Sequence, residues 1–150
     1  MEQNRFRHYL TKILLDIMFY GGIVTVIAVP FALPYVITFI RDSPRLLFFY
    51  SATLMSAGIF AVYILFQLRL MFKTLLSGTP FVAQNVSCLR KCAVASALIA
   101  LVFVIRLFMW FTISAAMIVI FFAMLSLFSL TIKDLFKQAI IYKEETDWTV

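Results

Sequence analysis

Few residues in this chain could carry out chemistry, and they stand singly or in pairs. Cys88 and Cys92 are one helical turn apart. A structural zinc site needs about four ligands, and no His lies near these thiols. The one histidine, His8, lies in a basic N-terminal segment where a solvated side chain is expected. With no Gly-rich phosphate loop and no acid pair, the sequence predicts no enzyme, no metal site and no cofactor.

Asp16 is the charge that most needs an explanation. It follows Lys12 by one turn at the start of a long apolar run, a spacing typical of an ion pair along one helix face. Placed one turn deeper, it would be an intramembrane acid and a functional candidate. Both interpretations stay open: a boundary ion pair, or the acid of a small oligomeric proton-coupled transporter.

The composition places these residues in lipid. Hydrophobic residues make up 64% of the chain and charged residues 13%, whereas a soluble domain has about 25% charged residues. The formal charge of +6 is spread between apolar runs rather than along one face. The positive-inside bias and anionic lipid account for that pattern, so we expect a lipid bilayer as partner and no direct nucleic-acid binding.

The apolar runs predict an all-α integral membrane protein with four transmembrane helices in one domain, residues 1–150. The expected helices are about 8–40, 46–76, 80–109 and 113–143, followed by a tail at 144–150. The last two are fused in the apolar stretch Ala93–Ile132, roughly twice the ~20 residues that cross a bilayer. This stretch must turn, and Trp110-Phe111-Thr112 is the expected place. Arg106, one turn earlier, fits an interfacial cation that extends toward the headgroups.

The distribution of Lys and Arg predicts that both termini lie in the cytosol. The cytosolic set is the larger: Arg5, Arg7, Lys12, Arg69, Lys73, Arg90, Lys91, Lys133, Lys137 and Lys143. The outer set is Arg41, Arg45 and Arg106. The excess of positive charge is spread over separate segments on one side, which favours this orientation.

Short connections predict two antiparallel hairpins that form a four-helix bundle. Arg41-Asp42-Ser43-Pro44-Arg45 is a tight outer turn between the first two helices. Between the hairpins, Gly78 suits a helix C-cap, Thr79 an N-cap and Pro80 the first turn of the next helix. Small residues predict close packing: Ala57 and Ala61 on the second helix, and Ala93, Ala97 and Ala100 on the third.

Helical periodicity continues beyond the membrane at the cytosolic side. One apolar stripe precedes the third transmembrane segment (Val82, Val86, Leu89, Ala93), and another follows the fourth (Ile132, Leu135, Phe136, Ala139, Ile140). We expect each helix to extend about 10 residues, or about 15 Å, into the cytosol. The stripes either pack on each other or on lipid, or they form a platform for a protein partner.

The C-terminal residues Glu144, Glu145, Asp147 and Trp148 are acidic and aromatic. Anionic lipid repels acidic side chains, so the tail is expected to point away from the membrane. An exposed Trp is unusual, and it indicates a side chain that a protein partner buries on binding. A frayed tail is the alternative interpretation.

Two motifs in the second half of the chain resemble a known family. The first is Gly78-Thr79-Pro80-Phe81 with Asn85 and Leu89-Arg90, and the second is Glu144-Glu145-Thr146-Asp147-Trp148-Thr149-Val150. With four apolar helices, they resemble the bacterial membrane family catalogued as domain of unknown function 2975. That family ends close to Glu-Glu-Asn-Asp-Leu-Thr-Ile, so this chain departs from it at Thr146, Trp148 and Val150.

The resemblance implies a bacterial inner-membrane protein without an established activity, whose relatives often accompany small helix-turn-helix regulators. A cytosolic helix-turn-helix protein is therefore the expected partner, and a homo-oligomer is left open. The candidate partner-binding residues are Gly78, Pro80, Phe81, Asn85, Arg90, Glu144, Glu145, Asp147, Trp148 and Thr149. Asp16 is the candidate residue for the transport alternative.

Overall fold

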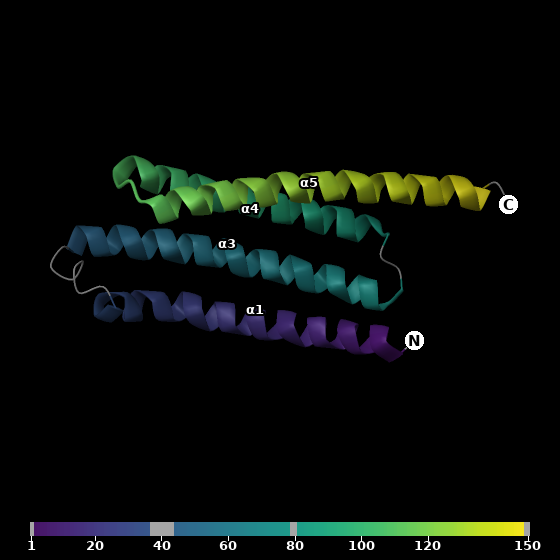
Figure 1. The fold of residues 1–150 in the computed structure, drawn as a ribbon, viewed down its shortest axis with the longest axis horizontal. Helices are drawn as coiled ribbons and strands as arrows, with labels where there is room; N and C mark the ends of the chain where they lie inside the picture. The colour runs from purple at the N-terminus through teal and green to yellow at the C-terminus, as the bar shows by residue number, and fades with distance from the viewer. Residues whose placement is uncertain (1, 37–43, 79–80, 149–150) are drawn as a thin grey trace.

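A computed structural model describes residues 2–36, 44–78 and 81–148, and the side chains of 9–35, 45–78, 81–146 and 148 (Figure 1). The described chain is all helical: α1 (Glu2–Val36), α3 (Pro44–Leu76), α4 (Ala83–Met109) and α5 (Ile113–Trp148). All four of these helices are long and apolar enough to cross a membrane. The predicted outer turn, which includes Arg41 and Asp42, lies largely outside the described residues.

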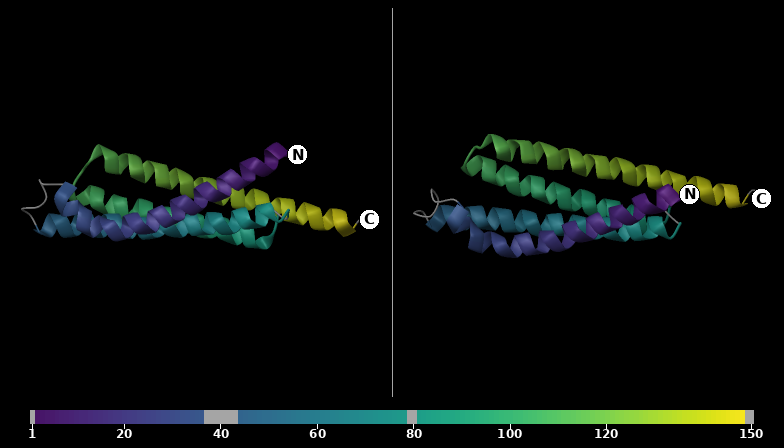
Figure 2. Two further views of the ribbon diagram at one scale, coloured as in Figure 1. Left: turned by 90° about the horizontal axis from the view of Figure 1, so that it is seen from below. Right: turned by 60° about the horizontal axis from the view of Figure 1, so that its bottom comes forward.

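The helices pack in the order in which they follow one another along the chain. Among the described residues, close backbone contacts join α1 to α3, α3 to α4 and α4 to α5, and no other pair. Figures 1 and 2 show the resulting row, with both chain termini at one end of the molecule. We call this the terminal end. The sequence predicted a bundle, but α1 and α5 make no close backbone contact in the described part of the chain.

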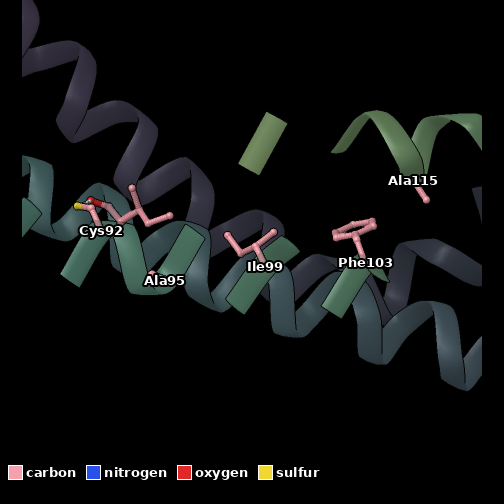
Figure 3. Packing of buried hydrophobic residues seen from close by; sticks show 6 residues of the cluster. Cys92, Ala95, Ile99, Phe103 and Ala115 are labelled. Atoms are coloured by element: carbon pink, nitrogen blue, oxygen red, sulfur yellow. Dashed lines mark hydrogen bonds between the residues drawn. The ribbon is translucent and has the colours of Figure 1, made fainter. Parts of the chain in front are cut away.

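The core of the row lies along α4, which packs between α3 and α5. Its buried cluster contains Cys92, Ala95, Ile99 and Phe103, with Ile64 from α3 and Ala115 from α5 (Figure 3). These residues follow one another along one helix face, and the small ones let the neighbouring backbones approach. Ala57 and Ala61, which the sequence predicted to allow close helix packing, pack against this core.

The predicted alanine face of α4 is only partly correct. Ala93 and Ala100 are buried, whereas Ala97 is exposed and Ala95 takes its place in the core. Since α4 contacts a helix on each side, it buries two adjoining faces rather than one. The α5 side of α4 is marked by a hydrogen bond from Ser126 Oγ to the Ala93 carbonyl, 2.9 Å long.

The connection from α3 to α4 follows the predicted helix stop but not the predicted start. Gly78 has a φ of +78°, and its N–H donates to the Leu75 carbonyl at 3.2 Å, as in a glycine C-cap. The next helix begins at Ala83, and its N-cap, Val82, makes no side-chain capping bond. The expected start at Pro80 is therefore wrong, because Phe81 and Val82 are not helical. Thr79 and Pro80 lie outside the described residues.

The turn between α4 and α5 forms where the sequence predicted it. α4 ends at Met109, and the extended backbone of Trp110 follows as its C-cap. The Trp110 N–H donates to the Arg106 carbonyl, and Thr112 accepts from the Ala116 N–H at the start of α5. The chain therefore reverses within three residues, which keeps α4 in contact with the part of α5 that follows the turn.

The last helix is longer than predicted. The expected end near 143 is wrong, because α5 continues to Trp148. No Gly or Pro interrupts this segment, Lys and Glu favour helix, and Thr146 Oγ1 bonds the Tyr142 carbonyl within the last turns. The C-terminal residues up to 148 are thus the end of a helix rather than a separate tail.

A matched pair of glycine substitutions tests the packing of α1 on α3. A carbon added to Gly58 would lie 2.5 Å from Val26 Cγ2, whereas one added to Gly21 meets nothing within 4 Å. We expect Gly58→Val to lower the free energy of unfolding by about 1–3 kcal/mol relative to Gly21→Val, because only the first overpacks the contact. Denaturant unfolding in detergent, followed by circular dichroism, measures the difference. Equal stabilities would show that this contact does not form.

Candidate functional site

Two features of the terminal end are candidate sites, because each brings together side chains that could bind a ligand or a partner. The first consists of Phe81 and the last part of α5, residues Lys133–Trp148, which we call the α5 extension. The second is a charged cleft between α1 and α3 around Asp16. They are described in turn, with the predicted residues that each contains.

The α5 extension projects beyond the part of α5 that a bilayer core could cover. The helix has 36 residues, or about 54 Å at ~1.5 Å per residue, against a hydrocarbon core of about 30 Å. Its exposed side chains include several large apolar ones: Leu135, Ile141, Tyr142 and Trp148. Trp148 is 90% exposed, which leaves nearly the whole indole without a protein contact.

Phe81 joins the α3–α4 connection to the α5 extension. Its ring lies 5.4 Å, centroid to centroid, from the ring of Phe136. Aromatic pairs at this separation stabilise a contact beyond their buried area. The structure thereby brings one residue of the first sequence motif onto the helix that carries the second motif. Phe81 still remains partly exposed and available to a further contact.

The other predicted residues divide into three groups. Glu144 and Glu145 are exposed near the end of α5. Gly78 caps α3, whereas Arg90 lines a separate groove of about 480 Å³ between α3 and α4, with Lys91 and Tyr63. The side chains of Pro80, Asp147 and Thr149 lie outside the described part of the chain.

Asn85 belongs to the interior rather than to the surface. Its side chain is 2% exposed, and Thr74 Oγ1 donates to its Oδ1 at 2.8 Å. A buried amide must be hydrogen-bonded to offset its desolvation. Because Thr74 lies in the last turns of α3, this bond fixes the start of α4 against the end of α3. Asn85 thus positions the connection that carries Phe81.

Asp16 pairs with an arginine that the sequence interpretation overlooked. Its Oδ1 lies 2.6 Å from Nε of Arg69, on α3, and the two side chains are 32% and 31% exposed. The predicted pairing with Lys12 is therefore wrong. The Arg69 guanidinium also stacks over the rings of Phe19 and Tyr20, at 4.9 and 5.5 Å. One feature of the sequence indicates this pair: Arg69 lies near the predicted cytosolic end of the second apolar run, as Asp16 does in the first.

The Asp16–Arg69 pair favours a structural role for the acid. A transport role would require the carboxylate to leave its partner and bind a proton or cation in turn. Instead, the guanidinium is held by the carboxylate on one side and by aromatic faces on the other. The pair thereby joins α1 to α3.

The cysteines and Arg106 lie outside both features. Cys88 and Cys92 are free thiols, each 3% exposed, and Cys92 Sγ lies 4.0 Å from the Ile64 carbonyl. The described residues contain no group of three or more His, Cys, Asp or Glu that could hold a metal ion. Arg106 stacks over Tyr50 at 4.5 Å at the opposite end of the molecule.

No family model, no curated protein and no solved structure matches this chain. The resemblance to the family of unknown function 2975 therefore rests on the two sequence motifs.

The role of the Asp16–Arg69 pair can be tested by a double-mutant cycle. We expect Asp16→Asn and Arg69→Gln each to destabilise the protein, with a coupling energy of about 0.5–1 kcal/mol because the pair is partly exposed. Denaturant unfolding in detergent gives the four free energies. The swapped pair Asp16→Arg with Arg69→Asp should recover part of the loss. A coupling energy of zero would show that the two side chains do not interact.

Proposed function

We propose that this chain is a non-catalytic, multi-pass membrane protein that binds a protein partner at its terminal end. The observation that carries the proposal is Trp148, nearly fully exposed at the end of a continuous helix that is longer than a bilayer core is thick. Trp is among the residues that most often dominate a protein interface. A helix end presents it without the entropy cost of ordering a flexible tail.

The charge distribution supports a cytosolic location for the terminal end. Among residues with described side chains, the cations near it are Lys12, Arg69, Lys73, Arg90, Lys91, Lys133, Lys137 and Lys143, against Arg45 and Arg106 at the opposite end. Cytosolic loops carry the excess of Lys and Arg in membrane proteins. This bias and the family resemblance support our proposal of a bacterial inner membrane, with both termini and the α5 extension in the cytosol.

The side chains of the α5 extension define the chemistry of the partner. The α5 extension exposes apolar groups at Leu135, Ile141 and Trp148, and the acidic Glu144 and Glu145 lie in its last turns, after Lys143. A complementary surface would offer an apolar groove for the helix and basic side chains at its rim. A small helix-turn-helix regulator, which the family resemblance implies, is basic where it binds nucleic acid and has exposed helices, and we propose it as the partner.

A non-catalytic role agrees with the surroundings of the acidic groups. Asp16 is paired with Arg69, and Asp134 lies 3.0 Å from Lys133. General acid–base catalysis uses groups that are free to exchange a proton with a substrate. These two carboxylates are engaged by cations instead, on different helices.

Two tryptophan substitutions test the proposed interface. We expect Trp148→Ala to reduce the amount of a co-expressed small helix-turn-helix protein recovered with the detergent-solubilised chain at least about tenfold, because it removes the interface anchor. Trp110→Ala, which removes an exposed Trp at the opposite end, should leave recovery unchanged. Quantitative mass spectrometry of the purified complex gives the ratio.

The same experiment separates the transport alternative. Asp16→Asn should leave partner recovery unchanged under the present proposal, whereas deletion of residues 144–150 should abolish it. Recovery of the chain alone, as a symmetric oligomer, would contradict the proposal. Proton-coupled export that depends on Asp16 would then be the function to measure.

A further inference from the structure

The charged cleft between α1 and α3 has the composition of an anion site. Its volume is about 610 Å³, and three cations line it: Lys12 from α1, and Arg69 and Lys73 from α3. Asp16 is the one acid among its lining residues, which leaves an excess of two positive charges. Apart from these charged residues and Ser77, the lining is apolar and consists of Leu15, Phe66, Leu70, Phe72 and Leu76.

The arginine of this cleft is held in position before any ligand arrives. Asp16 bonds its Nε, and the rings of Phe19 and Tyr20 lie against the guanidinium. The guanidinium has five N–H donors in one plane, and the Asp16 contact at Nε uses one of them, so others can still face a ligand. A planar fork of donors suits the oxygens of a phosphate group, and its preorganisation reduces the entropy cost of binding. The groove near Arg90 and Lys91 has cations as well, but within the described part of the chain neither has an ion pair or a ring contact that would orient it.

We propose that the α1–α3 cleft binds the phosphate group of an anionic ligand, independently of any protein partner at α5. Arg69 and the two lysines contact the phosphate oxygens, and the apolar walls accommodate a hydrocarbon chain. Basic pockets between transmembrane helices bind the headgroups of anionic lipids by the same combination. The shared chemistry is a phosphate ester, supplied either by a membrane phospholipid or by a soluble phosphate compound.

The test uses the full chain in neutral detergent and phosphatidylglycerol as the probe, with native mass spectrometry as the readout. We expect one phosphatidylglycerol to be retained, and phosphatidylcholine to be lost under the same conditions. In the variant Lys12→Gln with Lys73→Gln, the affinity should fall at least about tenfold. This variant leaves the Asp16–Arg69 pair intact, and circular dichroism verifies its helix content.

The matched control is Lys137→Gln with Lys143→Gln, which removes the same charge from the α5 extension. This control should bind phosphatidylglycerol as the natural sequence does. An equal loss in both variants would overturn the proposal, because it would mean that net charge alone retains the lipid. Unchanged binding in the Lys12 and Lys73 variant would overturn it as well.

A competition with inorganic phosphate identifies the source of the ligand. If millimolar phosphate displaces the lipid from the natural sequence, the cleft takes a soluble phosphate compound. If phosphatidylglycerol stays bound under those conditions, the ligand is a phospholipid whose chain contacts the apolar walls. Retention of neither ligand would contradict the site. None of these outcomes depends on whether Trp148 binds a protein.

Discussion

The arrangement of the four helices depends on how closely the backbones of α3 and α5 can approach α4. In lipid, apolar side chains gain little by leaving the solvent for one another, so helices associate where small residues permit dense packing. Cys92, Ala95 and Ser96 supply such positions on α4, and all three are buried. The hydrogen bond from Ser126 to the Ala93 carbonyl can form only because α5 lies near enough for a side chain to reach the α4 backbone. Where small residues are fewer, as on α1, the helix contacts one neighbour and leaves most of its described surface exposed.

Because α1 packs on α3 alone, polar contacts between these two helices matter more for the position of α1. Gly58 accommodates Val26 in the middle of that interface, and the Asp16–Arg69 pair joins the two helices near the terminal end. An ion pair that is about one third exposed contributes little stability by itself. Its stronger effect is on register: the pair and the glycine together define how α1 can sit on α3, because sliding by one turn would separate the charges and place a larger residue against Val26. The same pair fixes the donors of the proposed phosphate site.

Much of this architecture could be predicted from sequence because the bilayer imposes length and hydropathy on each helix. Local composition determines the apolar runs of α3 and α4 and the turn at Trp110. The cap at Gly78 depends on the conformational freedom of that one glycine. The partner of Asp16 could not be predicted, since it lies on another helix and its choice depends on how α1 and α3 align. For the same reason the buried bond between Thr74 and Asn85 was not foreseen, and Asn85 looked like a surface residue. The sequence predicts a tail from residue 144 because the segment is acidic, whereas α5 continues to Trp148 because no Gly or Pro stops the helix there.

The α3–α4 connection links the interior to the proposed partner surface. Gly78 ends α3, the Thr74–Asn85 bond fixes the start of α4, and the few residues between them carry Phe81 to Phe136. The Phe81–Phe136 contact supports the α5 extension near its base. Among the described helices only α4 makes close backbone contacts with α5, and α4 begins at Ala83, so the last turns of α5 have no helix beside them. An unbraced helix end in water would be marginal, since most helical stability in proteins comes from tertiary packing. The two sequence motifs, far apart in the chain, therefore act on one element: the first supports the helix on which the second is displayed.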